Sequence, residues 1–373
     1  MTTTVAMYVS GHGFGHSVRC AEVAAALLRH GARVIVRTDA PPWLFPAAID
    51  YVVRGQVDVG VAQHDGLQIH IDRTRENWRS FAATFEERAW REAEVLQQHD
   101  VDFVLGDIPP LAFAAARMAG IPSAALGNFG WDWIYGAWPD FGPVIECVQH
   151  GYSQADLLLR LPLHSTAPEA FPSFETIEDV PLIARRAKRS RNEMRAQLGV
   201  HERARVVLLS FGAFTADGLD LAALVSLTDY RVVLTPPLSA SADALPQNVL
   251  CLREQPSDYV SLLAACDVVI TKPGYGIVAD CLANRIAVLF TSRGPFREYD
   301  VLAEALTTLG RARYVPRDDL LAGHIAYHLA ALEAQPDTWA DIPLNGAEVV
   351  ANRVLQLRHG TLVTRPSKTP HIG

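Results

Sequence analysis

The stretch SGHGFGH at residues 10–16 follows a run of apolar residues, and TKPGYG at residues 271–276 follows another. Each reads as a glycine-rich turn that joins a predicted strand to a predicted helix. Backbone N–H groups at the start of a helix have no partner within it, so they are free to bind phosphate oxygens. Two such turns facing each other would hold a diphosphate-linked ligand between two α/β halves.

Short apolar runs alternate with amphipathic stretches on both sides of these turns. Buried strands are predicted at residues 5–10, 33–38, 102–106 and 123–127, and again at 205–210, 231–235, 249–252, 268–271 and 287–291. Such alternation is typical of a mostly parallel sheet covered by helices. Prolines at positions 162, 168, 172 and 181 interrupt regular structure between the two series, which indicates a hinge.

A chain of 373 residues is longer than one hydrophobic core usually supports. We therefore expect an amino-terminal domain over residues 1–165, a hinge over 166–190 and a second α/β domain over 191–345. Residues 346–359 are predicted to form a helix that could cross back to the first domain. The tail at 360–373 has no apolar periodicity, and disorder is expected there.

The net charge of -8 argues against a nucleic-acid partner, because polyphosphate backbones require a basic face. No segment reaches the ~18 consecutive apolar residues of a membrane span, and the first residues do not resemble a signal peptide. A cytoplasmic protein without integral membrane association is expected. The five cysteines are scattered, and neither they nor the histidines have the spacing of a zinc site, so we expect no metal.

Two α/β halves with a glycine turn after a strand in each resemble the GT-B glycosyltransferases, in which two Rossmann-like domains face each other across a cleft. Four strings sharpen this into a resemblance to the amino-terminal domain of plant L-arabinokinases: GHGFGH at 11–16, NFGWDWIY at 128–135, DVPLIARR at 179–186 and KPGYG at 272–276. That resemblance covers residues 5 to about 357. In those proteins a sugar kinase follows, and no kinase domain follows within these 373 residues, so kinase activity is not implied.

The resemblance implies an inverting, metal-independent transfer of a sugar from a nucleotide-sugar, UDP being the expected nucleotide, to a small-molecule acceptor. The nucleotide-sugar would be a co-substrate, and no cofactor is expected. An attacking hydroxyl needs a base of near-neutral pKa, which histidine supplies. By the resemblance, His16 stands where inverting GT-B enzymes carry that base. A histidine that caps its helix or lines the cleft without chemistry is the alternative.

Asp107 ends an apolar strand, where a carboxylate could fix the tautomer of His16 and steady its imidazolium. An Asp shortly before two prolines fits a helix N-cap equally well. Residues expected to bind the donor lie mainly on the two glycine turns and in loops after strands of the second half. They are Gly13, Gly15, Gly212, Ala213, Gln255, Lys272, Gly274, Tyr275, Gly276, Asp280 and Glu298.

Within that set, the resemblance assigns Asp280 to the ribose hydroxyls, and Glu298 lies in a loop that normally reads sugar hydroxyls. A solvated helix residue and a helix-start carboxylate are the respective alternatives. The acceptor is expected to contact His12, Asn128, Trp131, Trp133 and Tyr135. Clustered aromatic residues more often pack a core or a domain interface, and His12 could instead satisfy the loop backbone. The basic run at 185–189 could pair with an acidic acceptor or a phosphate, but a solvated linker is the expected reading.

Two other functions stay open on the sequence. A nucleotide-sugar epimerase could use the same architecture, but it would need further acid/base carboxylates in the cleft. A non-catalytic module that binds a sugar nucleotide or supports a partner is the other, because the similar plant region is fused to a kinase. The acceptor, the sugar and the oligomeric state are not readable from the residues.

Overall fold

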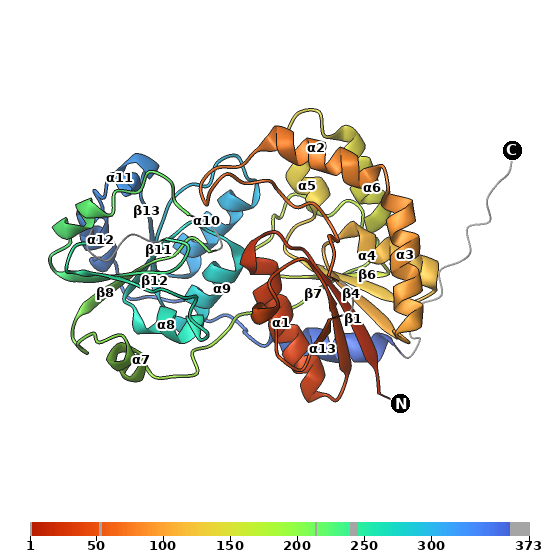
Figure 1. Ribbon diagram of the computed structural model, residues 1–373, viewed down its shortest axis with the longest axis horizontal. Coiled ribbons are helices and arrows are strands. Elements are labelled where there is room, and N and C mark those ends of the chain that lie inside the picture. The colour runs from red at the N-terminus through yellow and green to blue at the C-terminus, as the bar shows by residue number, and fades with distance from the viewer. Residues whose placement is uncertain (1, 52–53, 213–214, 239–244, 359–373) are drawn as a thin grey trace, which may run out of the picture.

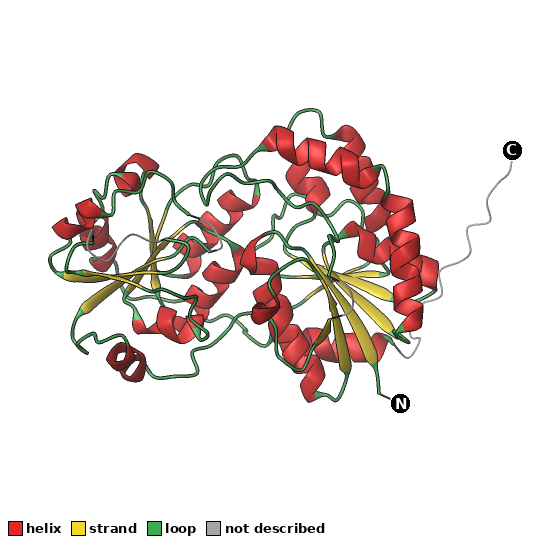
Figure 2. Ribbon diagram, in the orientation of Figure 1, coloured by secondary structure: helices red, strands yellow, loops and turns green. Residues whose placement is uncertain are grey.

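The computed structural model describes residues 2–51, 54–212, 215–238 and 245–358. Two α/β halves lie side by side (Figure 1), and helices cover the strands of each (Figure 2). The two predicted sheets of parallel strands are confirmed. Ala213 and the tail expected to be disordered lie outside the described residues.

The first half contains seven parallel strands in the order β3-β2-β1-β4-β5-β6-β7. The strands are β1 (Thr4–Val9), β2 (Arg33–Arg37), β3 (Asp50–Tyr51), β4 (Phe103–Asp107), β5 (Ser123–Gly127), β6 (Leu157–Arg160) and β7 (Ile177–Asp179). The helices are α1 (Gly13–Arg29), α2 (Ile71–Ala82), α3 (Phe85–Gln98), α4 (Pro110–Ala119), α5 (Trp131–Tyr135) and α6 (Gly142–Tyr152), with short 3-10 turns η1 (Pro42–Leu44) and η2 (Pro168–Ala170).

The second half contains six parallel strands in the order β10-β9-β8-β11-β12-β13. They are β8 (Arg205–Leu209), β9 (Tyr230–Leu234), β10 (Val249–Cys251), β11 (Val268–Thr271), β12 (Ala287–Phe290) and β13 (Ala312–Tyr314). The helices are α7 (Arg191–Gln197), α8 (Tyr259–Ala265), α9 (Tyr275–Asn284), α10 (Glu298–Leu309), α11 (Arg317–Leu321) and α12 (Ala326–Glu333), with the 3-10 turn η3 (Ala222–Ser226).

Strand β1 shows why these apolar runs form central parallel strands. All six of its residues are buried, and Met7 points into one core cluster while Tyr8 points into the cluster on the opposite face of the sheet. A strand that buries both faces must be apolar throughout, which is the pattern of a parallel sheet covered on both sides. The sheet therefore takes its stability from two helix layers.

The strand order of each sheet reverses at its centre, between β1 and β4 in the first half and between β8 and β11 in the second. Loops leave the carboxyl ends of the strands in opposite directions at such a point, and the crevice between them is where ligands bind in open α/β sheets. Val9 of β1 is paired with Asp107 of β4. The first glycine turn and Asp107 consequently start from the same point of the sheet.

Two segments of chain join the halves and run side by side. Ile183 in the linker pairs with Asn345 in an antiparallel bridge, and the chain then continues into helix α13 (Gly346–Leu357). Helix α13 packs against α1, and its buried face, which includes Val350 and Val354, belongs to a core cluster of the first half. The carboxyl-terminal helix thus lies on the first half (Figure 1).

A loop of the first half also reaches the second, and we call residues 61–69 the strap. Gln63 and Ile69 pair across it, and its tip lies against the second half. There the Gly66 N–H donates to the carbonyl of Thr215 at 2.8 Å, and fully buried Leu67 joins a core cluster of the second half. The strap therefore ties the two halves together on one side of the space between them.

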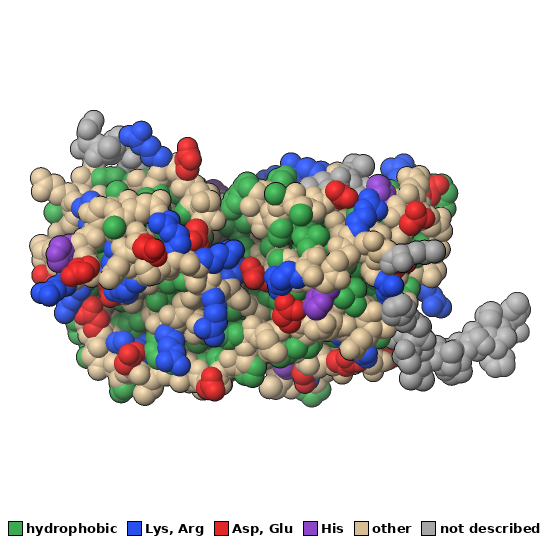
Figure 3. Space-filling model, turned by 90° about the horizontal axis from the view of Figure 1, so that it is seen from below, with side chains coloured by type: hydrophobic (Ala, Val, Ile, Leu, Met, Phe, Trp, Pro, Cys, Tyr) green, Lys and Arg blue, Asp and Glu red, His purple; other side chains and the backbone are tan. Residues whose placement is uncertain are grey.

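Positive and negative side chains are interspersed on the face of the molecule in Figure 3, rather than gathered by sign. Within the described part of the chain, no helix combines the length and the apolar character needed to cross a membrane.

Candidate active site between the two halves

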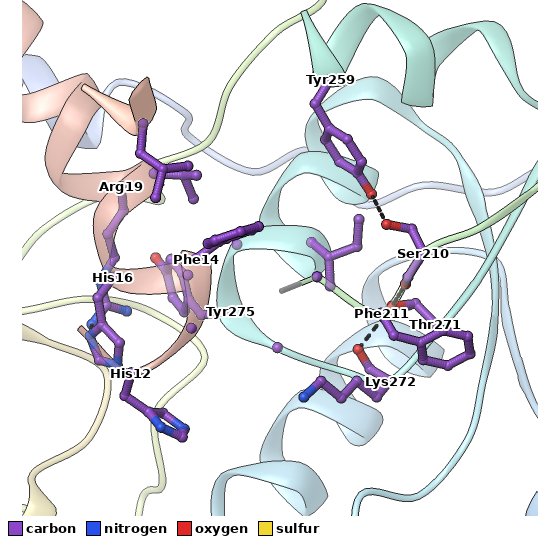
Figure 4. A pocket seen from close by; sticks show the side chains of 18 of the residues that line it. His12, Phe14, His16, Arg19, Ser210, Phe211, Tyr259, Thr271, Lys272 and Tyr275 are labelled. Atoms are coloured by element: carbon purple, nitrogen blue, oxygen red, sulfur yellow. Dashed lines mark hydrogen bonds between the residues drawn. The ribbon is translucent and has the colours of Figure 1, made fainter. Parts of the chain in front are cut away.

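A pocket opens between the halves, and both glycine turns line it. His12, Phe14 and His16 approach it from the first half, and Ser210, Tyr259 and Lys272 from the second (Figure 4). Of the described residues expected to bind the donor, all but Asp280 line this pocket. They are Gly13, Gly15, Gly212, Gln255, Lys272, Gly274, Tyr275, Gly276 and Glu298. Residues that are far apart in sequence thus converge at the two points where strand order reverses.

The two glycine turns touch each other. A Cβ atom added to Gly276 would lie 3.3 Å from the Cα of Gly15 and 3.0 Å from a methyl group of Val18. The turns therefore face each other as expected, and the binding of a diphosphate between the two halves stays a prediction. The pocket lies beside this contact. A side chain at position 276 would crowd Val18 and Gly15, whereas a Cβ atom on Gly15 would meet no atom closer than 3.7 Å.

His16 occupies the first turn of α1 and is 6% exposed. Its Nδ1 lies 2.8 Å from Oδ1 of Asp107. Arg19, one turn further along α1, donates from Nε and Nη2 to the two Asp107 oxygens at 2.6 and 2.5 Å, and Cys20 donates to Oδ2 at 3.1 Å. Asp107 is thus bonded to His16 rather than to the start of α4, where Pro109 occupies the N-cap position.

Burial opposes the negative charge of Asp107, but Arg19 and then His16 outweigh that effect and hold its pKa well below the usual range. The backbone beside it is strained, because Ile108 adopts a φ of +59°, a region that β-branched residues rarely enter. Strain of this kind costs on the order of 1–3 kcal/mol and concentrates at functional sites. Asp107 is accordingly a fixed, ionised acceptor.

The two histidines of the first glycine turn have different partners at Nδ1. An ionised carboxylate only accepts hydrogen bonds, so Asp107 favours the proton on Nδ1 of His16 and leaves Nε2 as the acceptor. Nδ1 of His12, in contrast, accepts from the Val61 N–H at 3.2 Å. Burial, and next the charge of Arg293, lower the His12 pKa well below its usual value. His12 is therefore neutral, with its proton on Nε2, and is a donor rather than a base.

A buried chain of hydrogen bonds links this site to the second half. Arg19 Nη1 donates to Oδ1 of Asn128 at 2.8 Å, and Nδ2 of Asn128 donates to Oε1 of Glu298 at 2.9 Å. Asn128 was expected to contact the acceptor, but it is 1% exposed and its amide is used in these bonds. The guanidinium of Arg19 also lies 4.8 Å from the ring centre of Tyr275, the first residue of α9.

Helix α9 begins beside the pocket with Gly274 at its N-cap, and no side chain caps it. A Cβ atom on Gly274 would meet nothing within 4 Å, so this backbone faces open space. Lys272 precedes it, and burial together with the charge of Arg293 lowers the pKa of Lys272 well below its usual value. The partial positive charge of a helix start and a neighbouring amine are the features that bind phosphate.

The predicted ribose contact of Asp280 is not what the structure shows. Asp280 is 1% exposed and accepts three hydrogen bonds from Arg185, one from its N–H and two from its guanidinium, the shortest at 2.6 Å. The hydrogen bonds to Asp280 therefore hold the linker against α9. Arg185 itself lines the pocket, although the basic run was read as a solvated linker.

The aromatic segment packs inside the first half instead of lining the pocket. Trp131 and Tyr135 are fully buried, and Trp133 is 6% exposed. Trp131 donates from Nε1 to Asp58 at 2.9 Å, and the Tyr135 hydroxyl donates to the carbonyl of Gly60 at 2.7 Å. The expectation that these three side chains contact an acceptor is wrong, because the rings pack against the core of the first half and are buried there.

Two cations of the site were missed in the sequence. Arg19 follows His16 by three residues, a spacing that places both on one face of a helix, so helical periodicity could have found it. Arg293 lies in the loop after β12, and nothing in its sequence neighbourhood distinguishes it from a surface arginine. Among the described residues, no three His, Cys, Asp or Glu side chains are grouped closely enough to hold a metal ion.

Comparison with known proteins is consistent with this geometry. L-arabinokinase of Arabidopsis thaliana is 32% identical over 358 residues, which is 93% of this chain and 34% of that protein. The chain thus spans about a third of the length of this relative. No protein-family model matches it.

Three solved structures share the arrangement of both halves. They are UGT89C1 of Arabidopsis thaliana complexed with quercetin (TM-score 0.61, 16% identity, 97% of this chain and 96% of that one), MurG of Acinetobacter baumannii (0.57, 15%, 96% and 100%) and the glycosyltransferase VinC in complex with dTDP (0.56, 16%, 96% and 96%). These identities are too low to transfer an activity, but the similarity covers nearly the whole chain. The protein therefore has the GT-B glycosyltransferase fold.

Proposed function

We propose that the protein transfers a sugar from a nucleotide-sugar to the hydroxyl group of a small-molecule acceptor, with inversion at the anomeric carbon and without a metal ion. One observation carries the proposal. His16, bonded to Asp107 at 2.8 Å, lines the same pocket as the uncapped start of α9. A base and a phosphate-binding backbone on opposite walls of one pocket are what such a reaction needs.

In this reaction Nε2 of His16 accepts the proton of the acceptor hydroxyl as its oxygen bonds to the anomeric carbon. The bond from that carbon to the β-phosphate oxygen breaks, and its electron pair leaves with the nucleoside diphosphate. Attack from the side opposite the leaving group inverts the configuration. Asp107 holds the imidazole in the required tautomer, and the α9 N–H groups with Lys272 stabilise the departing charge.

Support for the nucleotide comes from the fold and from the open backbone of Gly274. VinC, which has the same fold, was solved in complex with dTDP. UDP is our proposal for this chain, on the resemblance described above. Gln255 lines the pocket, but its Nε2 donates to the carbonyl of Pro236 at 2.6 Å, so this amide is already used.

A second candidate is a module that binds a sugar nucleotide without turning it over, and Arg19 favours it. The guanidinium occupies both oxygens of Asp107, and its Nη2 lies 3.1 Å from Nδ1 of His16. The carboxylate that would steady a protonated imidazole during the reaction is therefore already paired with a permanent cation. The epimerase gains no such support, since Glu298 is the sole carboxylate lining the pocket in the described part of the chain.

The His16→Ala and Asp107→Asn variants separate the two candidates. For all three proteins, donor cleavage is measured with radiolabelled UDP-sugars and a panel of acceptors, and UDP affinity is measured by calorimetry. A transferase should lose at least about 100-fold in turnover in His16→Ala, the usual range for a general base, while UDP affinity stays within about threefold. Turnover that survives in His16→Ala contradicts the assigned base. Tight UDP binding without any turnover in the wild type supports the binding module.

A further inference from the structure

Arg293 is a buried cation that the proposed reaction does not use. It lies in the loop between β12 and α10, lines the pocket and is 5% exposed. Its guanidinium lies 3.9 Å from the ring centre of Phe296. The carboxylate paired with it, Oε2 of Glu298, is 3.7 Å from Nη1, which is beyond hydrogen-bond distance. Nε is buried and has no hydrogen-bond partner among the described residues.

This arrangement is unfavourable in the ligand-free protein. A guanidinium removed from water loses several kcal/mol of solvation unless a well-placed anion compensates it. Glu298 compensates it only in part, because its Oε1 accepts from Asn128. Burial lowers the pKa of Arg293 accordingly, and Glu298 offsets only some of that effect. An uncompensated buried charge of this kind persists where a ligand supplies the missing anion.

The position of Arg293 places that anion at the reacting end of the pocket. Phe296 stacks on His12 with ring centres 6.2 Å apart and planes at 28°, and the His12 and His16 rings are 6.5 Å apart. Figure 4 shows His12 and His16 together, away from Tyr259 on the other wall. An anion at Arg293 would therefore lie near the donated proton of His12 and near the groups that react.

Building on the proposed function, we propose that Arg293 binds an oxyanion of the ligand beside His12. Two groups offer this chemistry at the reacting end: the β-phosphate of the nucleotide-sugar, and a carboxylate on the transferred sugar, as in a uronic acid. A planar guanidinium matches either with two parallel hydrogen bonds. His12 Nε2 adds a third donor, and Glu298 keeps its Oε1 on Asn128.

The test compares wild type with Arg293→Met. Methionine has a long, unbranched side chain that can still pack on Phe296, but it carries no charge. Arg297→Met is the matched control, because Arg297 lies in the same loop and over a ring, that of Trp133, but does not line the pocket. Binding of uridine, UMP, UDP, UDP-glucose and UDP-glucuronate is measured by calorimetry. Melting temperatures are measured with and without inorganic pyrophosphate.

A β-phosphate contact predicts that Arg293→Met loses about tenfold or more in affinity for UDP and both UDP-sugars, as expected for a hydrogen bond to a charged group, while uridine and UMP bind unchanged. A sugar carboxylate predicts that only UDP-glucuronate loses affinity. Either result supports the oxyanion site. Without ligand, Arg293→Met should also have a higher melting temperature than wild type, because the uncompensated buried charge is removed. If Arg293 served only to stabilise the fold, the variant would have a lower melting temperature.

Affinities of Arg293→Met within twofold of wild type for every ligand would overturn the inference. If wild type binds no nucleotide, the proposed function fails, and the pyrophosphate measurement still decides on Arg293. If pyrophosphate then raises the melting temperature of wild type and Arg297→Met but not of Arg293→Met, the result supports an oxyanion site at Arg293 whose ligand is not a nucleotide-sugar. An equal rise in all three proteins refutes it.

Discussion

Arg19 and Asp107 form a buried ion pair at the centre of the site, and their removal should show strong energetic coupling. Both side chains are almost completely buried, at 2% and 0% exposed. Removing one partner of such a pair leaves the other charge uncompensated, which costs about 3–5 kcal/mol. Arg19→Met and Asp107→Asn should each lose this amount of unfolding free energy, a large part of the ~5–15 kcal/mol that stabilises a typical protein.

The double variant should lose less than the sum, because neither charge then remains unpaired. We expect a coupling free energy of about 2–3 kcal/mol, at the upper end of what directly contacting residues show. The free energies come from urea unfolding at pH 7.5, followed by tryptophan fluorescence. If Arg19→Met does not fold, Arg19→Lys takes its place, since it keeps the charge and loses the two-point contact.

A surface pair provides the control. Arg353 and Glu178 are bonded in a similar way but are 34% and 39% exposed, so Arg353→Met with Glu178→Gln should show a coupling of at most ~1 kcal/mol. Asp107 has a lowered folded-state pKa, so its stabilisation is complete above the unfolded value of ~3.9 and is lost only as the pH falls below it. Additive effects of Arg19→Met and Asp107→Asn, within ~0.5 kcal/mol, would refute the buried pair.

Three further predictions concern the donor backbone, a buried acid and the strap. Gly274→Ala should leave the melting temperature unchanged and weaken UDP binding severalfold, because its methyl group enters open pocket space. Gly142→Ala, at a position that is equally open but outside the pocket, should change neither quantity. Equal UDP affinities of Gly274→Ala and wild type would contradict the proposal that the start of α9 binds the diphosphate. Burial raises the pKa of Asp58 to about 6, so its folded form binds more protons and stability falls as the pH rises from ~4 to ~6. In Asp58→Asn, the decrease in unfolding free energy between pH ~4 and ~6 should be smaller by about 3 kcal/mol, as measured by urea unfolding at a series of pH values. An unchanged pH profile would show that Asp58 does not cause the decrease. Leu67→Ala should speed hydrogen exchange at the strap amide that bonds across the halves, and unchanged exchange would mean that Leu67 does not hold the strap.

Much of the fold could be predicted because its signals are local. Buried parallel strands are continuous apolar runs, and glycine turns follow them directly, so the central strands of both sheets and the elements around His16 and Lys272 could be placed from sequence. The strands β3, β6, β7 and β13, which lie towards the edges of the sheets, were not predicted. The capping box at Ser190 and Glu193, which opens α7, is a local feature of the same kind. Each of these features depends on residues within one turn or one strand.

What the sequence could not show depends on contacts between distant residues. Asp280 has the same local setting whether it faces a ribose or Arg185, and only the path of the linker decides between them. Trp131 and Tyr135 are large and periodic in either case, and they are buried because the core around them accepts both rings. The contact between Gly15 and Gly276 arises from how the halves pack, so the residues of either turn alone do not predict it.

The central claim is that the pocket beside the two glycine turns binds a nucleotide without a metal ion. Its most direct test is a calorimetric titration of the metal-free protein with UDP, dTDP, GDP and ADP, each with and without EDTA. We predict that UDP binds with one site per chain, more tightly than the other three, and with the same affinity in the presence of the chelator. Failure of all four nucleotides to bind, or binding that requires added Mg²⁺, would contradict the account.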